Sequence, residues 1–414
     1  MTTEAPAGAA SFADLGVSDH LVDALATRGI TSPFEIQTLT IPDGLAGRDV
    51  CGKAQTGSGK TLAFGIPLVT RTGTGGSKRP TGLVLAPTRE LAAQVAEELR
   101  ILAAAGGQRV VTVYGGAPMH EQIEALERGV EIVVATPGRL IDLADRKKVF
   151  LDGVSTVVID EADQMADMGF LPQVHAVMRL VGGTDQTMLF SATLDGAVQS
   201  LVNSYLEDPV RYEAEDANEV VDTQEHRFIQ VHHMDKARVV ASIAEGVGRV
   251  LVFVRTKRNA DKVAKELRNE GIEAEAIHGD RRQNHRERAL RDFQAGKKPV
   301  LVATNVAARG LHIDDVDVVI HYDPPQDYKT FVHRSGRTAR AGEEGVVVTL
   351  VEWDQIEEVQ RLQKASGLHY EIVKMYSNDD RLGDLSEWEP DEVDLRLATD
   401  VDLSRRFRMR RKRR

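Results

Sequence analysis

Short runs of apolar, mostly β-branched residues alternate with amphipathic stretches from about residue 49 to residue 350. Each run is apolar at consecutive positions, which favours strands buried on both faces. In the stretch 90–104, Leu91, Val95 and Leu102 fall on one face of a helix, so the pattern predicts an amphipathic helix there. The predicted strands are 49–52, 82–86, 110–114, 131–135, 156–160, 187–191, 249–254, 274–277, 299–303, 317–322 and 345–350.

Buried strands that are separated by helices are typical of doubly wound parallel sheets, so the predicted fold class is α/β. A polar, acidic stretch after residue 208 interrupts the rhythm and predicts a linker between two domains. The predicted divisions are a disordered tail (1–11), a first domain (12–208), a linker (209–222), a second domain (223–375) and a final tail (376–414).

The composition narrows the class of protein. The chain has 414 residues, of which 42% are hydrophobic and 28% charged, which is ordinary for a soluble protein with real cores. No run approaches the roughly 18 apolar residues of a membrane span, and the first ten residues lack the basic residues of a secretory signal. Cys51 is the single cysteine, which excludes an internal disulfide framework and predicts a reducing, cytoplasmic compartment.

The charge is unevenly distributed along the chain. A net charge of −11 argues weakly against nucleic-acid binding. Residues 384–402 carry eight acidic residues against one basic residue, whereas eight of the eleven residues 404–414 are Arg or Lys. The basic segment predicts RNA tethering through counterion release; the alternative is a disordered, solubilising end that pairs with the acidic stretch before it.

A glycine-rich segment, 54–61, follows a predicted strand and begins a predicted helix, which is the context of a phosphate-binding loop. Lys60 would reach the β- and γ-phosphates, and the Thr61 hydroxyl would ligate Mg²⁺. The general pattern has glycine where this chain has Ala54, and the alternative is a glycine-rich turn that binds nothing. The residues assigned to the nucleotide are Ala54, Gln55, Thr56, Gly57, Ser58, Gly59, Lys60 and Thr61.

Two acidic residues stand at the end of another predicted strand. Asp160 closes the run 156–160, and the carboxyl end of a parallel strand lies beside the phosphate loop in such folds. Asp160 would hold Mg²⁺ largely through water, and Glu161 would orient and deprotonate the attacking water. The alternative is an acidic first helical turn, which the helix dipole favours by itself.

The run Asp160-Glu161-Ala162-Asp163, with the Ala-first phosphate loop upstream, resembles the DEAD-box family of ATP-dependent RNA helicases. The resemblance extends from Phe12 to about Leu350. It implies two tandem RecA-like domains, ATP as substrate, Mg²⁺, and RNA that is bound through its backbone without recognition of its sequence.

The resemblance also implies an adenine-reading segment at 29–37. Gln37 would pair with the adenine edge and Phe12 would stack on the ring, while Phe34 and Glu35 depart from the usual residues. The residues implied to couple ATP turnover to strand separation are Asp163, Ser191, Thr193 and His333.

The implied RNA contacts follow predicted strands in both domains. They offer hydroxyls, backbone N–H groups and guanidinium groups, which are the donors that phosphates and 2′-hydroxyls accept from. Thr88 and Thr136 are also suitable helix caps, which is the alternative for these two residues. The implied RNA contacts are Pro87, Thr88, Arg89, Gly115, Gly116, Thr136, Pro137, Gly138, Arg139, Arg255, Thr256, Gln283, Arg286 and Thr304.

Segment 333–340 resembles the arginine-finger motif of the family. Arg337 and Arg340 would face the γ-phosphate; the alternative is a solvated basic helix face. Arg255, Asn305 and His312 stand where the family usually has Asn, Asp and Asp, and His312 replaces the carboxylate that is expected at the ribose.

The predicted function is therefore that of a monomeric, Mg²⁺-dependent, RNA-stimulated ATPase that opens short RNA duplexes or remodels RNA–protein complexes. Because the catalytic groups are divided between two domains, ATP and RNA would jointly favour domain closure. The alternatives are a DNA-directed helicase and an RNA clamp that binds ATP with little turnover. Ribosome-assembly and RNA-decay complexes are compatible partners, and no membrane is expected.

Overall fold

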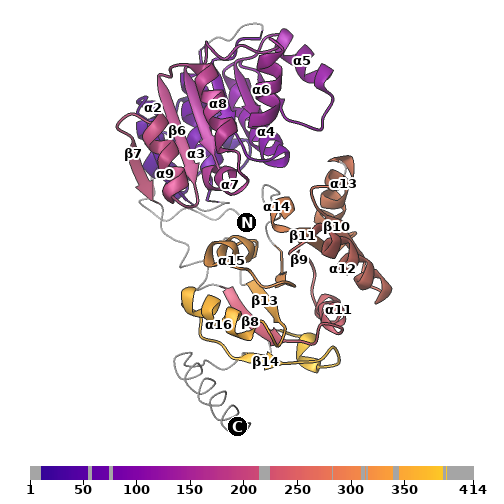
Figure 1. The fold of residues 1–414 in the computed structure, drawn as a ribbon. Coiled ribbons are helices and arrows are strands. Elements are labelled where there is room, and N and C mark those ends of the chain that lie inside the picture. The colour runs from indigo at the N-terminus through magenta and orange to yellow at the C-terminus, as the bar shows by residue number, and fades with distance from the viewer. Residues whose placement is uncertain are drawn as a thin grey trace, which may run out of the picture. The chain divides into compact units, whose positions relative to one another are not determined.

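The chain folds into two compact units that divide between strands β7 and β8 (Figure 1). The predicted disordered tail, 1–11, lies outside the described residues except for Ser11, and so does the part of the predicted final tail beyond residue 388. The computed structural model describes residues 11–54, 58–73, 78–213, 224–281, 283–308, 313, 316–338, 345–385 and 388.

The first unit contains a seven-stranded sheet in which all pairs of neighbouring strands are parallel. The order across the sheet is β3-β4-β2-β5-β6-β1-β7. Its strands are β1 (Val50–Lys53), β2 (Gly82–Leu85), β3 (Val110–Val113), β4 (Ile132–Ala135), β5 (Thr156–Asp160), β6 (Gln186–Ser191) and β7 (Val210–Glu213).

Helices cover both faces of this sheet (Figure 1). Successive residues of a strand point to opposite faces, so Val84 belongs to one hydrophobic core and Leu83 and Leu85 to the other. Helices α1–α4 contribute to the first core, and α5–α9 to the second. The helices are α1 (Asp19–Ala26), α2 (Glu35–Leu45), α3 (Lys60–Arg71), α4 (Arg89–Ala105), α5 (Met119–Glu127), α6 (Pro137–Asp145), α7 (Ala162–Asp167), α8 (Leu171–Val181) and α9 (Gly196–Tyr205).

The second unit repeats this topology. Its seven-stranded parallel sheet has the order β10-β11-β9-β12-β13-β8-β14. When the strands of each unit are numbered along the chain, both sheets have the same order, 3-4-2-5-6-1-7. The strands are β8 (Gln224–Gln230), β9 (Val250–Val254), β10 (Ala274–Ile277), β11 (Val300–Thr304), β12 (Val318–His321), β13 (Gly345–Val351) and β14 (Ile372–Lys374). The helices are α11 (Lys236–Gly246), α12 (Lys257–Asn269), α13 (Gln283–Gln294), α14 (Asn305–Ala308), α15 (Tyr328–Ser335), α16 (Ile356–Ala365) and the 3₁₀ helix η1 (Asp380–Leu382).

The predicted fold class, two tandem doubly wound parallel α/β domains, is confirmed, but three strands were missed. Strand β8 contains polar residues that are nevertheless buried. Gln224 donates to the Ser335 carbonyl at 2.9 Å, and Arg227 donates to the Leu385 carbonyl at 3.2 Å. Such bonds leave no hydrophobic pattern for a prediction to use. The other missed strands are the edge strands β7 and β14.

Two predicted boundaries need correction. The predicted linker, 209–222, begins too early, because Val210–Glu213 pairs with β1 and the Tyr212 hydroxyl donates to Asp43. The predicted final tail also begins too early. Leu382 and Leu385 are buried in the core of the second unit, and the backbone N–H of Ser377 donates to Asp235. No helix within the described residues is both long enough and apolar enough to cross a bilayer.

Gly52 lies where β1 closely approaches Phe190 of β6. A Cβ at residue 52 would lie 2.5 Å from a ring carbon of the buried Phe190. We expect Gly52→Ala to destabilise the first unit by about 1–3 kcal/mol, the usual penalty of overpacking. Gly73→Ala is the control, because nothing lies within 4 Å of a Cβ there. Urea unfolding followed by circular dichroism measures both; equal midpoints would contradict the packing described.

Candidate functional site

The residues assigned to the nucleotide and to coupling gather at the carboxyl ends of three neighbouring strands. Lys60 begins the helix that follows β1, Asp160 ends β5, and Ser191 ends β6. In the order β5-β6-β1 these strands are adjacent and parallel, so their carboxyl ends lie at one edge of the sheet. The backbone N–H of Ala54 donates to the Ser191 carbonyl at 3.0 Å, which joins the start of the phosphate loop to β6.

A buried ion pair joins the phosphate loop to the acidic segment. Lys60 Nζ donates to Glu161 Oε1 at 2.7 Å, and the Lys60 side chain is only 6% exposed. Burial alone would lower the pKa of Lys60, but the carboxylates of Glu161 and Asp160 outweigh burial and hold the pKa above its ordinary value. The ammonium therefore stays charged and lies where a phosphate would compete with Glu161 for it.

Asp160 and Glu161 are held close together in the same buried space. The Glu161 N–H donates to Asp160 Oδ1 at 3.0 Å, and the Glu161 backbone is left-handed, with φ of 50°. A non-glycine residue in this conformation is strained, and such strain is common at functional sites. Burial, followed by repulsion from Glu161, raises the pKa of Asp160 to about 7 despite the attraction of Lys60.

Gln37 lies next to the phosphate loop rather than on the surface. It is 1% exposed; its amide oxygen accepts from the Phe34 N–H and its amide nitrogen donates to the Gly59 carbonyl, both at 2.9 Å. An amide oxygen has a second lone pair and the nitrogen a second hydrogen, so both remain able to pair with adenine. Gly59 has φ of +86°, and a Cβ there would lie 2.3 Å from the Gln37 nitrogen, so only glycine fits.

The other nucleotide assignments are placed less directly. Phe12 is buried in the core that also contains Leu21 and Leu25, and the predicted stacking on adenine would require one face of its ring to be uncovered. Ser58 and Thr61 are half-buried. The assignments that lie outside the described residues are Gln55, Thr56 and Gly57.

The residues assigned to coupling in the first unit are in contact. The Asp163 N–H donates to the Ser191 hydroxyl at 3.1 Å, and the Thr193 hydroxyl donates to Asp163 Oδ2 at 3.4 Å. Asp163 is fully buried at the start of α7. The end of β6 is therefore bonded directly to the acidic segment.

The RNA assignments of the first unit follow the other group of neighbouring strands, β3-β4-β2. Arg89 and Arg139, which lie in α4 and α6, both reach the loop after β3. Arg139 donates to the Ala117 carbonyl at 3.4 Å, and a Cβ at Gly116 would lie 1.9 Å from the Arg89 guanidinium. The two arginines and this loop form one basic surface at the carboxyl edge of the sheet.

Some of the remaining residues assigned to RNA in the first unit lie at the N-termini of helices. The Thr88 hydroxyl accepts from the Leu91 N–H at 3.3 Å and caps α4, as the alternative prediction for this residue had it. Thr136 precedes α6 without such a bond. Pro87 and Pro137 are buried, Gly115 is half-buried and Gly138 is exposed.

In the second unit, residues assigned to RNA lie at the ends of β9 and β11. Arg255 is exposed and its N–H donates to Asp323 Oδ2 at 2.6 Å, while the Thr256 hydroxyl caps α12 by accepting from the Asn259 N–H at 3.1 Å. Thr304 is buried at the end of β11.

Arg334, which lies in the arginine-finger segment but had no role predicted for it, connects these strand ends. Arg334 of α15 donates to Asn305 Oδ1 and to the Asp323 carbonyl, both at 2.7 Å, and its guanidinium lies 5.2 Å from the centre of the Phe253 ring. Asn305, which replaces the usual Asp, thus still accepts a bond. Only the three-dimensional structure brings these residues together, because Arg334 is 29 residues from Asn305.

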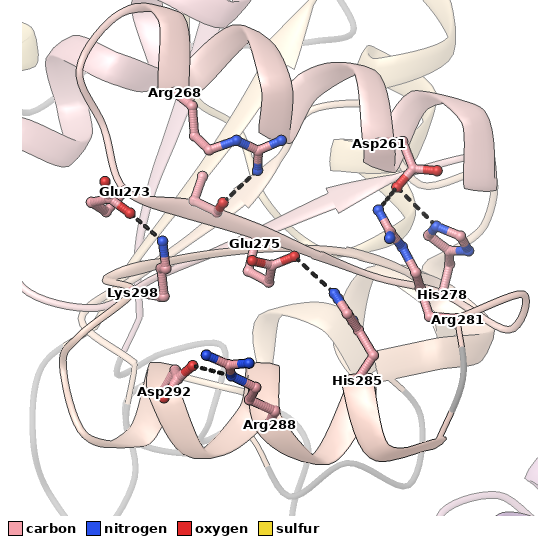
Figure 2. Close-up of polar contacts among 11 residues, drawn as sticks. Asp261, Arg268, Glu273, Glu275, His278, Arg281, His285, Arg288, Asp292 and Lys298 are labelled. Atoms are coloured by element: carbon pink, nitrogen blue, oxygen red, sulfur yellow. Dashed lines mark hydrogen bonds and ion pairs between the residues drawn. The ribbon is translucent and has the colours of Figure 1, made fainter.

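Helix α13 carries Arg286 and lies among charged residues, of which His285 joins it to β10 (Figure 2). His285 lies 3.3 Å from Glu275 of β10, and His278 lies 3.1 Å from Asp261, which also accepts from Arg281. Partial burial alone would raise the pKa of Asp261, but the bonds from His278 and Arg281 hold it below its ordinary value. The side chain of Gln283 lies outside the described residues.

In the arginine-finger segment, Arg337 is buried and His333 is half-buried. The predicted alternative of a solvated basic face therefore does not describe Arg337. Arg340 and His312 lie outside the described residues.

The residues present are suitable for a magnesium–nucleotide complex. Mg²⁺ prefers oxygen ligands and is commonly bound by one or two carboxylates together with substrate phosphates and water. Asp160 offers a carboxylate, and Thr61 offers a hydroxyl at the first turn of α3. Within the described part of the chain, no three His, Cys, Asp or Glu side chains gather into a metal-binding group.

The raised pKa of Asp160 predicts a pH-dependent stability. An aspartate has a pKa of 3.8 when unperturbed, so between about pH 4 and pH 7 the folded protein binds the proton and the unfolded chain does not. Stability therefore falls as the pH rises through this window. We expect Asp160→Asn to remove this slope, so that the variant gains stability relative to the parent at pH 8 more than at pH 4.

Thermal unfolding at the two pH values measures this difference. The control is Asp152→Asn on the surface, where the bond from Arg79 lowers the pKa and any slope has the opposite sign. A stability difference between variant and parent that is the same at pH 4 and pH 8 would contradict the raised pKa.

Comparisons with known proteins agree with the site. Residues 34–201 match the family described as DEAD/DEAH box helicase, and residues 235–342 match the helicase conserved C-terminal domain. The chain is 39% identical over 362 residues to DEAD-box ATP-dependent RNA helicase 30 of Arabidopsis thaliana. That match covers 85% of this chain and 61% of the relative, so the chain spans about three fifths of its length.

Two solved structures extend the comparison. S. cerevisiae Dbp5 bound to RNA and ADP BeF3 is similar with a TM-score of 0.79 and 29% identity, over 91% of this chain and 98% of that one. A DEAD box protein from the hyperthermophile Methanococcus jannaschii has a TM-score of 0.50 and 32% identity, over 88% of this chain and 99% of that one. With the phosphate loop, the acidic segment and both matched domains in place, the chain belongs to the DEAD-box family of ATP-dependent RNA helicases.

Proposed function

We propose that this protein hydrolyses ATP in an RNA-stimulated manner and uses the cycle to open short RNA duplexes or to remodel RNA–protein complexes. One observation carries the proposal. In the first sheet, the nucleotide residues occupy the carboxyl ends of β1 and β5, with the coupling residue Ser191 at the end of β6 between them, and the residues assigned to RNA follow β3, β4 and β2. One sheet edge thus presents both sets of residues.

The nucleotide residues divide the chemistry among them. Lys60 neutralises the β- and γ-phosphates, which take the place of Glu161 at its ammonium. Glu161, released from that pair, accepts the proton of the attacking water. Asp160 and Thr61 would hold Mg²⁺, which neutralises phosphate charge, and a nearby dication favours the ionised form of Asp160. Gln37 selects adenine.

We further propose that Arg337 and Arg340 of the second unit stabilise the charge on the transferred phosphoryl group. Neither unit then has a complete set of catalytic groups by itself. RNA bound by both units favours the arrangement that hydrolyses ATP, and ATP favours RNA binding by the same factor. The bonds of Asp163 to Ser191 and Thr193 support the coupling role proposed for these residues, because they tie the acidic segment to the end of β6.

RNA is the proposed nucleic acid, and the similarity to Dbp5, whose structure was solved with RNA bound, supports this choice. Contacts to the sugar–phosphate chain carry no base information, so binding is sequence-independent. An RNA clamp with little turnover is the second candidate; it is disfavoured because the general base Glu161 is present. We propose a monomer in the cytoplasm, where the single, buried Cys51 stays reduced, with RNA-decay or ribosome-assembly complexes as partners.

Lys60→Ala tests the ATPase proposal. Phosphate release is measured without nucleic acid, with single-stranded RNA and with DNA of matched sequence. We expect RNA, but not DNA, to stimulate ATP hydrolysis by the parent protein. Lys60→Ala should lower turnover by roughly 100-fold or more, as for removal of a group that binds developing charge. Lys148→Ala is the control. RNA-stimulated turnover in the Lys60→Ala variant would refute the proposal; a parent that binds RNA and ATP with no stimulation would favour the clamp.

Arg89→Ala and Arg139→Ala test the basic surface. Each is expected to weaken single-stranded RNA of any sequence and to reduce the salt dependence of binding by roughly 0.7 in log–log slope, the value for one phosphate contact. Arg179→Ala, an exposed arginine of α8, is the control and should leave the slope unchanged. Titrations at several salt concentrations measure the slope. Equal slopes in all three variants would place RNA elsewhere.

A further inference from the structure

Three exposed apolar side chains lie at one edge of the second sheet. Met234 is 77% exposed, Trp353 76% and Tyr376 53%. Among the described residues of the second unit, no large hydrophobic side chain is more exposed than these three. They follow strands β8, β13 and β14. Neither the nucleotide nor the RNA assignments include any of them, and grouped exposed apolar residues commonly mark an interaction surface.

The backbone brings these three residues together. Gln230 at the end of β8 is in register with Val351 of β13 and with Lys374 of β14. Trp353 and Tyr376 come two residues after these partners. Adjacent strands lie about 4.8 Å apart, so the three loops begin side by side. We call the residues Met234, Trp353 and Tyr376, with the loops that carry them, the Trp353 surface.

Bonds between the loops keep the Trp353 surface in place. Lys236 Nζ donates to Glu352 Oε1 at 2.9 Å, which ties the loop after β8 to the loop after β13. The N–H and hydroxyl of Ser377 both donate to the Asp235 carboxylate at 2.8 Å, which ties the loop after β8 to the loop after β14. A surface that is fixed in this way can bind a partner with little loss of conformational freedom.

Acidic residues surround Trp353. Residues 352–358 contain four carboxylates and no basic side chain, and Asp354, Glu357 and Glu358 are exposed. Asp379 and Asp380 lie beyond Tyr376. The cations nearby are partly engaged: Lys374 lies 5.4 Å from the Tyr376 ring, and Arg381 donates to Asp379. Carboxylates repel phosphates, so RNA does not suit this surface.

Aromatic rings among carboxylates suit arginine. A guanidinium stacks on a Trp or Tyr face and pairs with carboxylates at its edge. The chain itself contains such a segment: eight of the eleven residues 404–414 are Arg or Lys, with Phe407 and Met409 between them. The fifteen residues 389–403 that precede it have seven charged side chains but no aromatic one.

The segment 404–414 is within reach of the Trp353 surface. Trp388 is the last described residue, and the Arg381 guanidinium lies 5.5 Å from the centre of its ring. Arg381 is five residues after Tyr376. The sixteen steps from 388 to 404 span at most about 55 Å when extended, and a flexible chain of that length averages about 22 Å.

We propose that the Arg-rich segment 404–414 docks on the Trp353 surface of its own chain. Its arginines stack on Trp353 and Tyr376 and pair with the exposed carboxylates of Asp354 and Glu358, because Glu352 already pairs with Lys236 and Glu357 with Arg361. The same arginines cannot hold RNA phosphates at the same time, so docking competes with the RNA tethering expected of this segment. The proposal does not depend on ATP hydrolysis.

Tryptophan fluorescence tests the docking directly. The chain has two tryptophans, so Trp388→Phe leaves Trp353 as the only one. Acrylamide quenching at low salt is compared among this full-length protein, the same protein without 404–414, and one in which the eight basic residues of 404–414 are Gln. We expect quenching to increase by roughly twofold in both altered proteins, in line with loss of stacking at an exposed site.

A second measurement needs no tryptophan substitution. A synthetic peptide of residues 404–414 is added to the protein that lacks this segment, and hydrogen exchange is followed in 231–236 and 352–358. We expect added protection in both segments, and binding weakened roughly threefold by Trp353→Ala, as for one exposed cation–π contact. Leu180→Ala is the control, because it removes an exposed apolar side chain of the first unit.

The results that overturn the proposal are equally definite. Quenching of Trp353 and exchange of 231–236 and 352–358 that do not change with the segment would exclude docking. A fall in RNA affinity on deletion of 404–414, without either change, would assign the segment to RNA alone. Peptide binding that Trp353→Ala leaves unaffected would place the segment on other carboxylates.

Discussion

Parallel strand direction is the constraint on which the rest of this structure depends. Because every neighbouring pair in both sheets is parallel, the segments that follow the strands all emerge at one edge. Residues far apart in sequence, such as Lys60 and Glu161, thereby meet without a continuous motif. The shared strand order of the two units repeats the arrangement, with Thr256, Thr304 and Arg334 near the corresponding edge of the second sheet. Strand order then separates the nucleotide residues from the basic surface.

At the nucleotide edge, the protein maintains charges in a place that disfavours them. Asp160 and Glu161 share a buried space with one ammonium, so two carboxylates repel each other beside a single positive charge. Burial and this repulsion raise the pKa of Asp160, and the backbone of Glu161 is left-handed. Replacing one member of such a group leaves the others uncompensated, so the group is poorly suited to stabilising the fold. It is well suited to receive a ligand that brings phosphates and a dication, because the ligand relieves the repulsion.

Much of the fold followed from the hydrophobic pattern, because strands buried on both faces are apolar throughout; the predicted strands 156–160 and 274–277 match β5 and β10 residue for residue. The misses share a cause. β8 buries polar side chains through partners more than 100 residues away, and β7 depends on pairing with β1. The same limit applies to the site: a motif indicated Gln37, but its bond to Gly59, the burial of Phe12 and the contact of Arg334 with Asn305 are tertiary facts that no local pattern encodes.

The central claim is that ATP and RNA favour one and the same arrangement of this protein. Equilibrium titration measures it most directly: the affinity for a non-hydrolysable ATP analogue with and without saturating single-stranded RNA, and the affinity for that RNA with and without the saturating analogue. Linkage requires the two ratios to be equal. The account predicts that both exceed one and agree within error. A ratio of one in both titrations, with each ligand still bound, would contradict it.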